Sequence, residues 1–290
     1  MKRILMRIIG ALCILGAAAL MFFPNWMTID GISRKDMRKV RNDVVGITET
    51  VSESFAERVK ASEDFKDDLR DNDLPYTRAT IKKRFKTIGN LAAELMNDTI
   101  SLKEVTQTAF LLPGVLKDAE NLLDSDARTM LFSQAANYVV YSGSEPIPDA
   151  DGDYVSELAD AMDEMVEGAV DGLAGYSIIF IAVGALFVLI LLLAVASAVT
   201  HVCNKGRWLK YLFLVVLVAM VAGSCVGISF ASDMLPEMFA GMPLMENASL
   251  RISVMPFLAV AVMFMPIVLD VIYERKNEQK KVEDQADGKQ

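Results

Sequence analysis

The chain has 290 residues, 53% of them hydrophobic, and its formal net charge is −9. The hydrophobic fraction is high for a soluble domain and is expected when several segments dissolve in lipid. Residues 33–175 hold 28 acidic and 17 basic side chains, a net charge of −11, so nearly all the negative charge lies in one block that repels nucleic acid.

The N-terminal segment has a basic start followed by an uncharged run from Ile8 to Phe23. This pattern fits a signal peptide cleaved after Ala19 or an uncleaved signal anchor, and both would export the block after it. We expect a signal anchor over residues 1–27, because the apolar run continues to Phe23 and Trp26 suits the outer interface.

Residues 28–175 predict an acidic, extracytoplasmic domain that is helical throughout. Apolar residues recur every three or four positions, and capping signals such as Ser33 with Asp36 mark helix starts. The predicted helices run from Ser33 to about Arg70, from Arg78 to Asn97, from Ser101 to a stop or kink at Pro113, from Val115 to Leu123 and from Ala127 to Tyr141. Together they predict an antiparallel bundle large enough for its own core.

An acidic stripe precedes the second span, and we expect one long helix to join the stripe to that span. Its members share one helical face: Asp153, Glu157, Asp160, Glu164, Glu167 and Asp171. Like charges at this spacing disfavour a helix, so the stripe is predicted to pair with the basic residues after the first span. These are Arg34, Lys35, Arg38, Lys39 and Arg41. The alternative is an acidic face exposed to solvent.

The segment from Asp149 to Asp160 partly matches a calcium-binding loop. The candidate ligands are Asp149, Asp151, Asp153, Glu157 and Asp160. Tyr154 stands where that loop requires glycine, which favours the alternative that Asp151 or Asp153 simply caps the following helix. Calcium is the one candidate cofactor. His201 and Cys203 would supply only two ligands, too few for structural zinc.

Three further apolar segments predict spans at residues 176–200, 209–231 and 251–272. Lys and Arg are concentrated before the first span, in the loop 201–208 and in the tail 273–290, whereas the loop 232–250 is acidic. The positive-inside rule therefore predicts that both termini are cytoplasmic, with 232–250 outside and a disordered cytoplasmic tail at 273–290. No span carries an ionisable residue near its centre, which argues against proton relays and ion-coupled carriers.

Small residues recur every four positions in the third span, at Ala219, Gly223, Gly227 and Ala231. Such a row lets another helix approach closely. Two partners remain open: the second span of the same chain, or a span of another subunit.

The predicted fold class is therefore all-α: a four-span transmembrane helical protein with an extracytoplasmic helical bundle between spans 1 and 2. The exported block contains no cysteine and no histidine, so catalytic devices that use them are excluded there. We expect a non-enzymatic protein of the cell membrane whose external domain binds a partner, ligand or envelope component and whose spans anchor or assemble a complex. Its partners are then lipid, other membrane or envelope proteins, or a second copy.

Two alternatives remain. The layout is similar, by topology alone, to the MacB and FtsX class of permeases, and this similarity implies a membrane subunit of a transport system. The loop 201–208 leaves little room for the coupling helix of that class. The small-residue row also permits an oligomeric pore.

Overall fold

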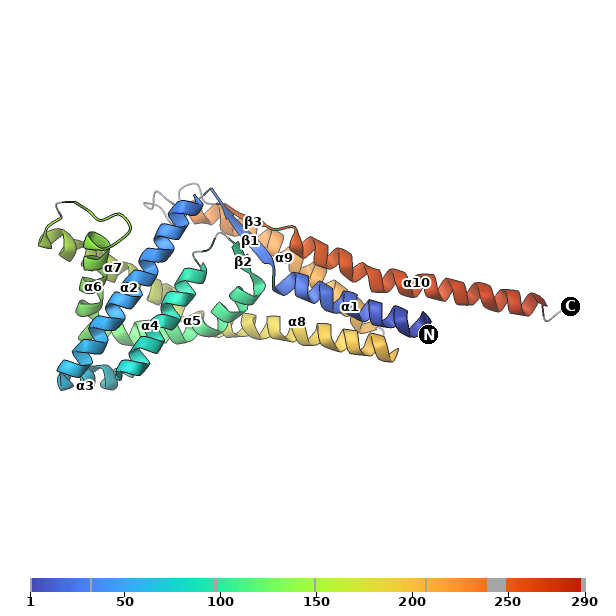
Figure 1. Cartoon of the computed structure of the whole chain (residues 1–290), viewed down its shortest axis with the longest axis horizontal. Coiled ribbons are helices and arrows are strands. Elements are labelled where there is room, and N and C mark those ends of the chain that lie inside the picture. Colours follow the sequence, from blue (N-terminus) through green and yellow to red (C-terminus); the bar gives the residue numbers. More distant parts are fainter. Residues whose placement is uncertain are drawn as a thin grey trace. The chain divides into compact units, whose positions relative to one another are not determined.

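The computed structural model describes residues 2–31, 33–95, 97, 99–148, 150–206, 208–238 and 249–287. Within these ranges the chain forms ten helices and three short strands (Figure 1). It divides into two compact units, one of Met1–Asp30, Ser101–Lys103 and Ala185–Gln290, the other of Gly31–Ile100 and Glu104–Gly184. We call the second unit the inter-span domain. The mostly helical architecture confirms the predicted fold class.

Four helices contain segments long and apolar enough to cross a bilayer. The helices are α1 (Lys2–Phe22), α8 (Ser177–Cys203), α9 (Trp208–Met238) and α10 (Met255–Asp287). Their apolar segments are Ile4–Phe22, Ser177–Cys203, Trp208–Ser229 and Met255–Lys276. The chain is thus a multi-pass membrane protein with four candidate spans.

The first unit also contains strands that the sequence did not predict. Strand β1 (Asn25–Asp30) pairs antiparallel with β3 (Ser249–Ile252), with Met27 opposite Ile252. A third short strand, β2 (Thr99–Ser101), is divided between the two units. Strands of three to six residues next to apolar helices are too short to show a clear alternation of apolar and polar residues. In the same unit α1 packs along α10.

The inter-span domain is built from six helices: α2 (Arg34–Ala61), α3 (Glu63–Asp71), α4 (Arg78–Leu95), α5 (Leu102–Leu123), α6 (Ala127–Tyr141) and α7 (Gly152–Ala174). Figure 1 shows α2 and α4 side by side, and α2 also packs on α6, which packs on α7. At the core the ring of Phe55 meets the rings of Phe65 and Phe85 edge to face, with centroids 5.5 and 5.4 Å apart.

Two predicted helix boundaries in this domain were wrong. The first helix ends at Ala61, because the Ser62 hydroxyl accepts a hydrogen bond from the Phe65 amide and caps a new helix, α3. Helix α5 does not stop at Pro113 but runs through it to Leu123, so of the two alternatives the stop is wrong and the kink stays a prediction. Ala109 and Leu116, on either side of the proline, are both buried, and their packing offsets the loss of one backbone hydrogen bond.

Two longer segments also differ from expectation. Helices α7 and α8 are separated at Gly175 and Tyr176, rather than forming one continuous helix. At the other end, α10 continues to Asp287, through most of the tail that we expected to be disordered. This tail is rich in Glu, Lys and Gln, which readily extend a helix that is already nucleated.

Candidate ligand-binding cavity

An apolar cavity of about 360 Å³, partly open to solvent, lies between the helices of the inter-span domain. Helices α2, α3, α4, α5, α6 and α7 all contribute side chains to its wall. The apolar side chains of this wall include Ile47, Val51, Phe55, Phe85, Ile88, Val115, Leu122, Leu131, Phe132, Met162 and Met165.

The helical period explains why these residues converge. Ile47, Val51 and Phe55 recur every four residues and form one face of α2. Two small residues of the wall, Ala119 on α5 and Ala135 on α6, leave part of the space between the helices unfilled. Protein interiors are otherwise close-packed, so apolar side chains that leave a volume of this size unfilled mark a candidate binding site.

The main polar feature of the cavity wall is an ion pair between α4 and α5. The Arg84 guanidinium pairs with the Asp118 carboxylate and also donates a hydrogen bond to the Gly114 carbonyl oxygen at 2.9 Å. The hydrogen bond to Asp118 raises the pKa of Arg84, and partial burial opposes this shift. Because the two charges are paired, they are retained beside an apolar space at a lower desolvation cost.

A polar pocket of about 540 Å³ adjoins the cavity. The two share four wall residues: Leu74, Pro75, Arg84 and Asp118. The rest of the polar pocket is lined by Arg70, Asp73, Tyr76, Thr77, Thr80, Lys83 and Thr87. An apolar space and a charged space thus meet at the Arg84–Asp118 pair.

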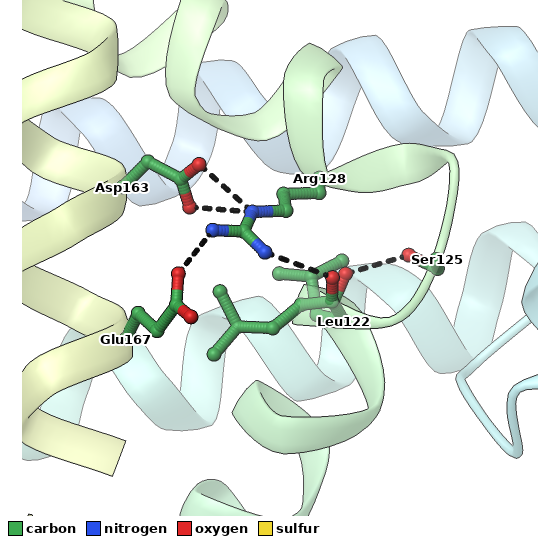
Figure 2. A network of polar contacts seen from close by, with 6 residues as sticks. Leu122, Ser125, Arg128, Asp163 and Glu167 are labelled. Carbon is green, nitrogen blue, oxygen red and sulfur yellow. Dashed lines mark hydrogen bonds and ion pairs between the residues drawn. The ribbon is translucent and has the colours of Figure 1, made fainter. Parts of the chain in front are cut away.

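A second ion-pair network fastens α6 to α7 next to the cavity (Figure 2). Arg128 Nε donates to both Asp163 oxygens, at 2.7 and 2.8 Å, and its Nη2 donates to Glu167 at 2.5 Å. These hydrogen bonds, first to Asp163 and then to Glu167, raise the pKa of Arg128. Leu131 and Val166, one turn further along α6 and α7, line the cavity. The ion pairs therefore hold together two of the helices that form its wall.

For Lys39 and Arg41 of the basic cluster and Glu167 of the acidic stripe, the predicted pairing is replaced by other contacts. Lys39 pairs with Glu145, and Arg41 donates to the Asn97 side chain at 3.2 Å. Glu167 pairs with Arg128 of α6. The remaining stripe residues, Asp153, Glu157, Asp160, Glu164 and Asp171, are exposed, as in the alternative of a solvated face.

The candidate calcium ligands are only partly within the described residues, because Asp149 lies outside them. Asp151 caps α7, its carboxylate accepting a hydrogen bond from the Tyr154 amide at 2.9 Å, as the alternative interpretation expected. Asp153, Glu157 and Asp160 lie exposed on α7. Among the described residues no three His, Cys, Asp or Glu side chains are grouped to hold a metal ion. Calcium binding stays a prediction.

In the first unit the row of small residues on α9 is exposed at the positions that the structure describes. Ala219, Gly223 and Gly227 are exposed, and the side chain of Ala231 lies outside the described part of the chain. A Cβ added at Gly223 or Gly227 meets no described atom within 4 Å, so the first alternative, a contact with the second span, is not seen at these two glycines. Packing against another subunit stays a prediction.

His201 and Cys203 lie in different environments. His201 is buried, and its imidazole ring lies so close to Gly10 of α1 that an added Cβ there would overlap it, whereas Cys203 is exposed. His201 therefore packs between α8 and α1.

Sequence reasoning missed an ion pair between two spans. Lys210 of α9 is only 2% exposed and pairs with Asp270 of α10. The signal was available, since two opposite charges stood near the ends of consecutive predicted spans, but each alone is consistent with an interfacial residue.

The cavity was also missed. Helical periodicity identifies apolar faces, but only the packing of several helices shows whether the side chains fill the space between them. In comparisons with known proteins, no family model, no curated protein and no solved structure matches the chain significantly.

Proposed function

We propose that this chain is a non-catalytic, four-span protein of the cell membrane whose inter-span domain lies outside the cytoplasm and binds an apolar ligand in its cavity. The cavity carries the proposal. Its volume of about 360 Å³ falls within the range typical of small-molecule sites, about 300–1,000 Å³. Such sites are also mostly apolar with a few fixed polar groups, as here.

The wall chemistry supports binding rather than catalysis. The charged wall residues Arg84 and Asp118 neutralise each other, and Thr48 contributes a hydroxyl that donates to the Val45 carbonyl oxygen at 2.8 Å. A nucleophile needs an adjacent base, and a general acid needs a pKa near neutrality. The groups that line this cavity are instead held in structural contacts.

The proposed orientation depends on the positive-inside rule. This rule counts the Lys and Arg residues near the ends of the spans. Lys210 is left out of the count because it is buried in an ion pair with Asp270. Lys205 and Arg207 remain between α8 and α9, and the basic residues at both chain ends support the same side. Both termini are therefore placed in the cytoplasm.

The permease alternative has less support. Helix α8 ends at Cys203 and α9 begins at Trp208, so residues 204–207 are all that connect them. A coupling helix that contacts an ATPase does not fit into this connection. An oligomeric pore would use the open row at Gly223 and Gly227, but the row by itself names no partner.

Photolabelling tests the ligand-binding proposal. The full-length chain in phosphatidylcholine nanodiscs is exposed to a diazirine-bearing dodecanol, and labelled peptides are mapped by mass spectrometry. We expect labels at Met162 and Met165, in addition to labels on the lipid-facing spans. Labels confined to the spans would contradict the proposal.

A matched pair of variants makes this test specific. Ala119→Trp places an indole ring in the cavity, whereas Ala161→Trp places one on the exposed face of α7. The first variant should lose the label in the cavity while both keep the labels on the spans. Equal thermal unfolding of the two variants controls for misfolding.

Cysteine accessibility tests the orientation. In a chain with Cys13 and Cys225 replaced by alanine, Cys203 is exposed on the proposed cytoplasmic side and Glu120→Cys adds an exposed thiol on α5. An impermeant maleimide added to intact cells should label position 120 only, and should label Cys203 after permeabilisation. The reverse pattern would overturn the orientation.

A further inference from the structure

We propose that the ligand is a single-chain amphiphile with an anionic oxygen head group, its chain in the apolar cavity and its head in the adjoining polar pocket beside Lys83 and Arg84. This inference rests on the proposed function and specifies the chemistry of its ligand. It is carried by the shared wall of the two spaces, Leu74, Pro75, Arg84 and Asp118.

The shared wall defines an amphiphilic site. On one side, Phe85 and Ile88 of α4 face the apolar cavity. On the other side, Lys83 and Thr87 of the same helix face the polar pocket, and Arg84 borders both spaces. A ligand that fills both must change from apolar to polar along its length, as an amphiphile does.

The charge of the polar pocket selects the sign of the head group. Its lining holds three basic residues, Arg70, Lys83 and Arg84, and two acidic ones, Asp73 and Asp118. Arg70, Arg84 and both aspartates are held in ion pairs, which leaves the ammonium of Lys83 as the lining charge without an ion pair among the described residues. An anionic head group beside Lys83 would therefore meet an unpaired positive charge.

Most polar groups of the pocket already have partners. Arg70 pairs with Asp67 at 2.9 Å and with Asp71 at 3.7 Å, and Asp73 pairs with Lys117 at 3.1 Å. The hydroxyls of Thr77 and Thr80 bond to each other. Among the described residues, exposed Lys83 shows no ion pair, so its ammonium is available to a head group.

Arg84 supplies the second contact by exchanging partners. A carboxylate or phosphate oxygen resembles the Asp118 carboxylate and can share or replace it on the guanidinium fork. Asp118 thus competes with the head group. The volume of the cavity, near the lower limit for ligand sites, fits one chain better than two.

Competition between chain-matched compounds tests this inference. The full-length chain in phosphatidylcholine nanodiscs is labelled with a photoreactive dodecanol at pH 8, and four competitors are compared: dodecanoate, dodecyl phosphate, dodecanol and dodecyltrimethylammonium. The two anions should displace the cavity label at concentrations roughly three- to tenfold below that of dodecanol. The cation should be the weakest, and the order of the two anions distinguishes carboxylate from phosphate.

Three variants assign the effect to residues. Lys83→Gln should remove most of the preference for anions, while Lys86→Gln, on the same helix but outside the polar pocket, should keep it. Asp118→Asn should strengthen anion binding because it frees Arg84. Thermal unfolding of each variant shows whether it is folded.

The outcomes separate this inference from the proposed function. If dodecanol labels the cavity but all four competitors act equally, or the cation acts best, the head-group inference fails and apolar binding stands. If no compound protects a labelled cavity residue, both fail. An anion preference that Lys83→Gln leaves unchanged would also overturn the assignment.

Discussion

Arg128 Nε lies 2.7 and 2.8 Å from the two carboxylate oxygens of Asp163, so one side chain of α6 is held by both oxygens of one side chain of α7. The network continues to Glu167, one turn along α7, and Arg128 Nη1 also donates to the Leu123 carbonyl oxygen at 3.3 Å. Figure 2 shows the Arg128 guanidinium between Asp163 and Glu167 on one side and the chain at Leu122 on the other. The contact therefore joins three helices that line the cavity.

Removing this contact should loosen the cavity wall. We expect Arg128→Ala to lower the free energy of unfolding by about 1–3 kcal/mol, since it removes several charge-assisted hydrogen bonds that are partly shielded from water. Amide hydrogen exchange should accelerate in α6 and α7. Arg128→Lys should recover only part of the loss, because an ammonium cannot reproduce the guanidinium fork.

Arg78 provides the control for this prediction. It pairs with Glu57 at 3.2 Å, but both side chains are 59% exposed. Exposed pairs contribute about 0–1 kcal/mol, so Arg78→Ala should change stability and exchange little. Equal effects of the two alanine variants would show that Arg128 has no special role.

The sequence predicted the features that depend on long stretches of chain. Four apolar runs and several amphipathic helices, including Ala127–Tyr141 as observed, result from composition and the helical period. Breaks within a predicted helix, where a capping side chain competes with continuation of the helix, were harder to predict. Ser62 breaks the first helix with a single capping hydrogen bond, although Glu63 and Asp64 after it were a recognisable sign of a helix start.

The cavity and the charge pairs depend on contacts between distant segments, which one sequence does not specify. The acidic stripe needed counter-charge, but the structure supplies it to Glu167 through Arg128, which is 39 residues away. Arg84 and Asp118 are 34 residues apart, and nothing in the spacing links them. Such pairs are determined by helix packing and not by periodicity.

The Lys39–Glu145 pair should contribute a defined pH dependence. The hydrogen bond between them lowers the pKa of Glu145 and raises that of Lys39. Their contribution to stability is therefore complete above the ordinary glutamate pKa of about 4.3 and is lost as pH falls through the lowered value. On the basic side it is complete below about 10.4, the ordinary lysine pKa, and is lost as pH rises through the raised value.

Lys39→Met provides the measurement for this pair. The difference in unfolding temperature between the variant and the unmodified chain should be constant from about pH 5 to 9 and shrink below the lowered pKa of Glu145. Both residues are accessible to salt, so the difference should also fall as ionic strength rises. A difference that does not depend on pH would show that the lysine acts through packing alone.

Helices α2 and α4 should not tolerate a larger residue at Gly89, where α4 lies against Thr48 of α2. A Cβ added at Gly89 of α4 would lie 2.4 Å from Thr48 Oγ1 and 3.3 Å from its Cβ. We expect Gly89→Ala to destabilise the domain by about 1–3 kcal/mol, as overpacking usually does. The variant Gly89→Ala with Thr48→Ala removes the closest atom and should recover most of the loss. Thermal unfolding of the single and double variants measures this coupling.

The Lys210–Asp270 pair makes the sharpest prediction for the membrane-spanning helices. Lys210 is almost fully buried and Asp270 is the only ion-pair partner it has among the described residues. Breaking a buried pair leaves one charge without compensation and typically costs about 3–5 kcal/mol, whereas replacing both charges with apolar groups is often neutral. We therefore expect Lys210→Met and Asp270→Leu each to lower the unfolding temperature of the nanodisc-embedded chain strongly. Their combination should restore most of it. A double variant less stable than either single variant would mean that the two charges act independently, and that α9 and α10 are held together by other contacts.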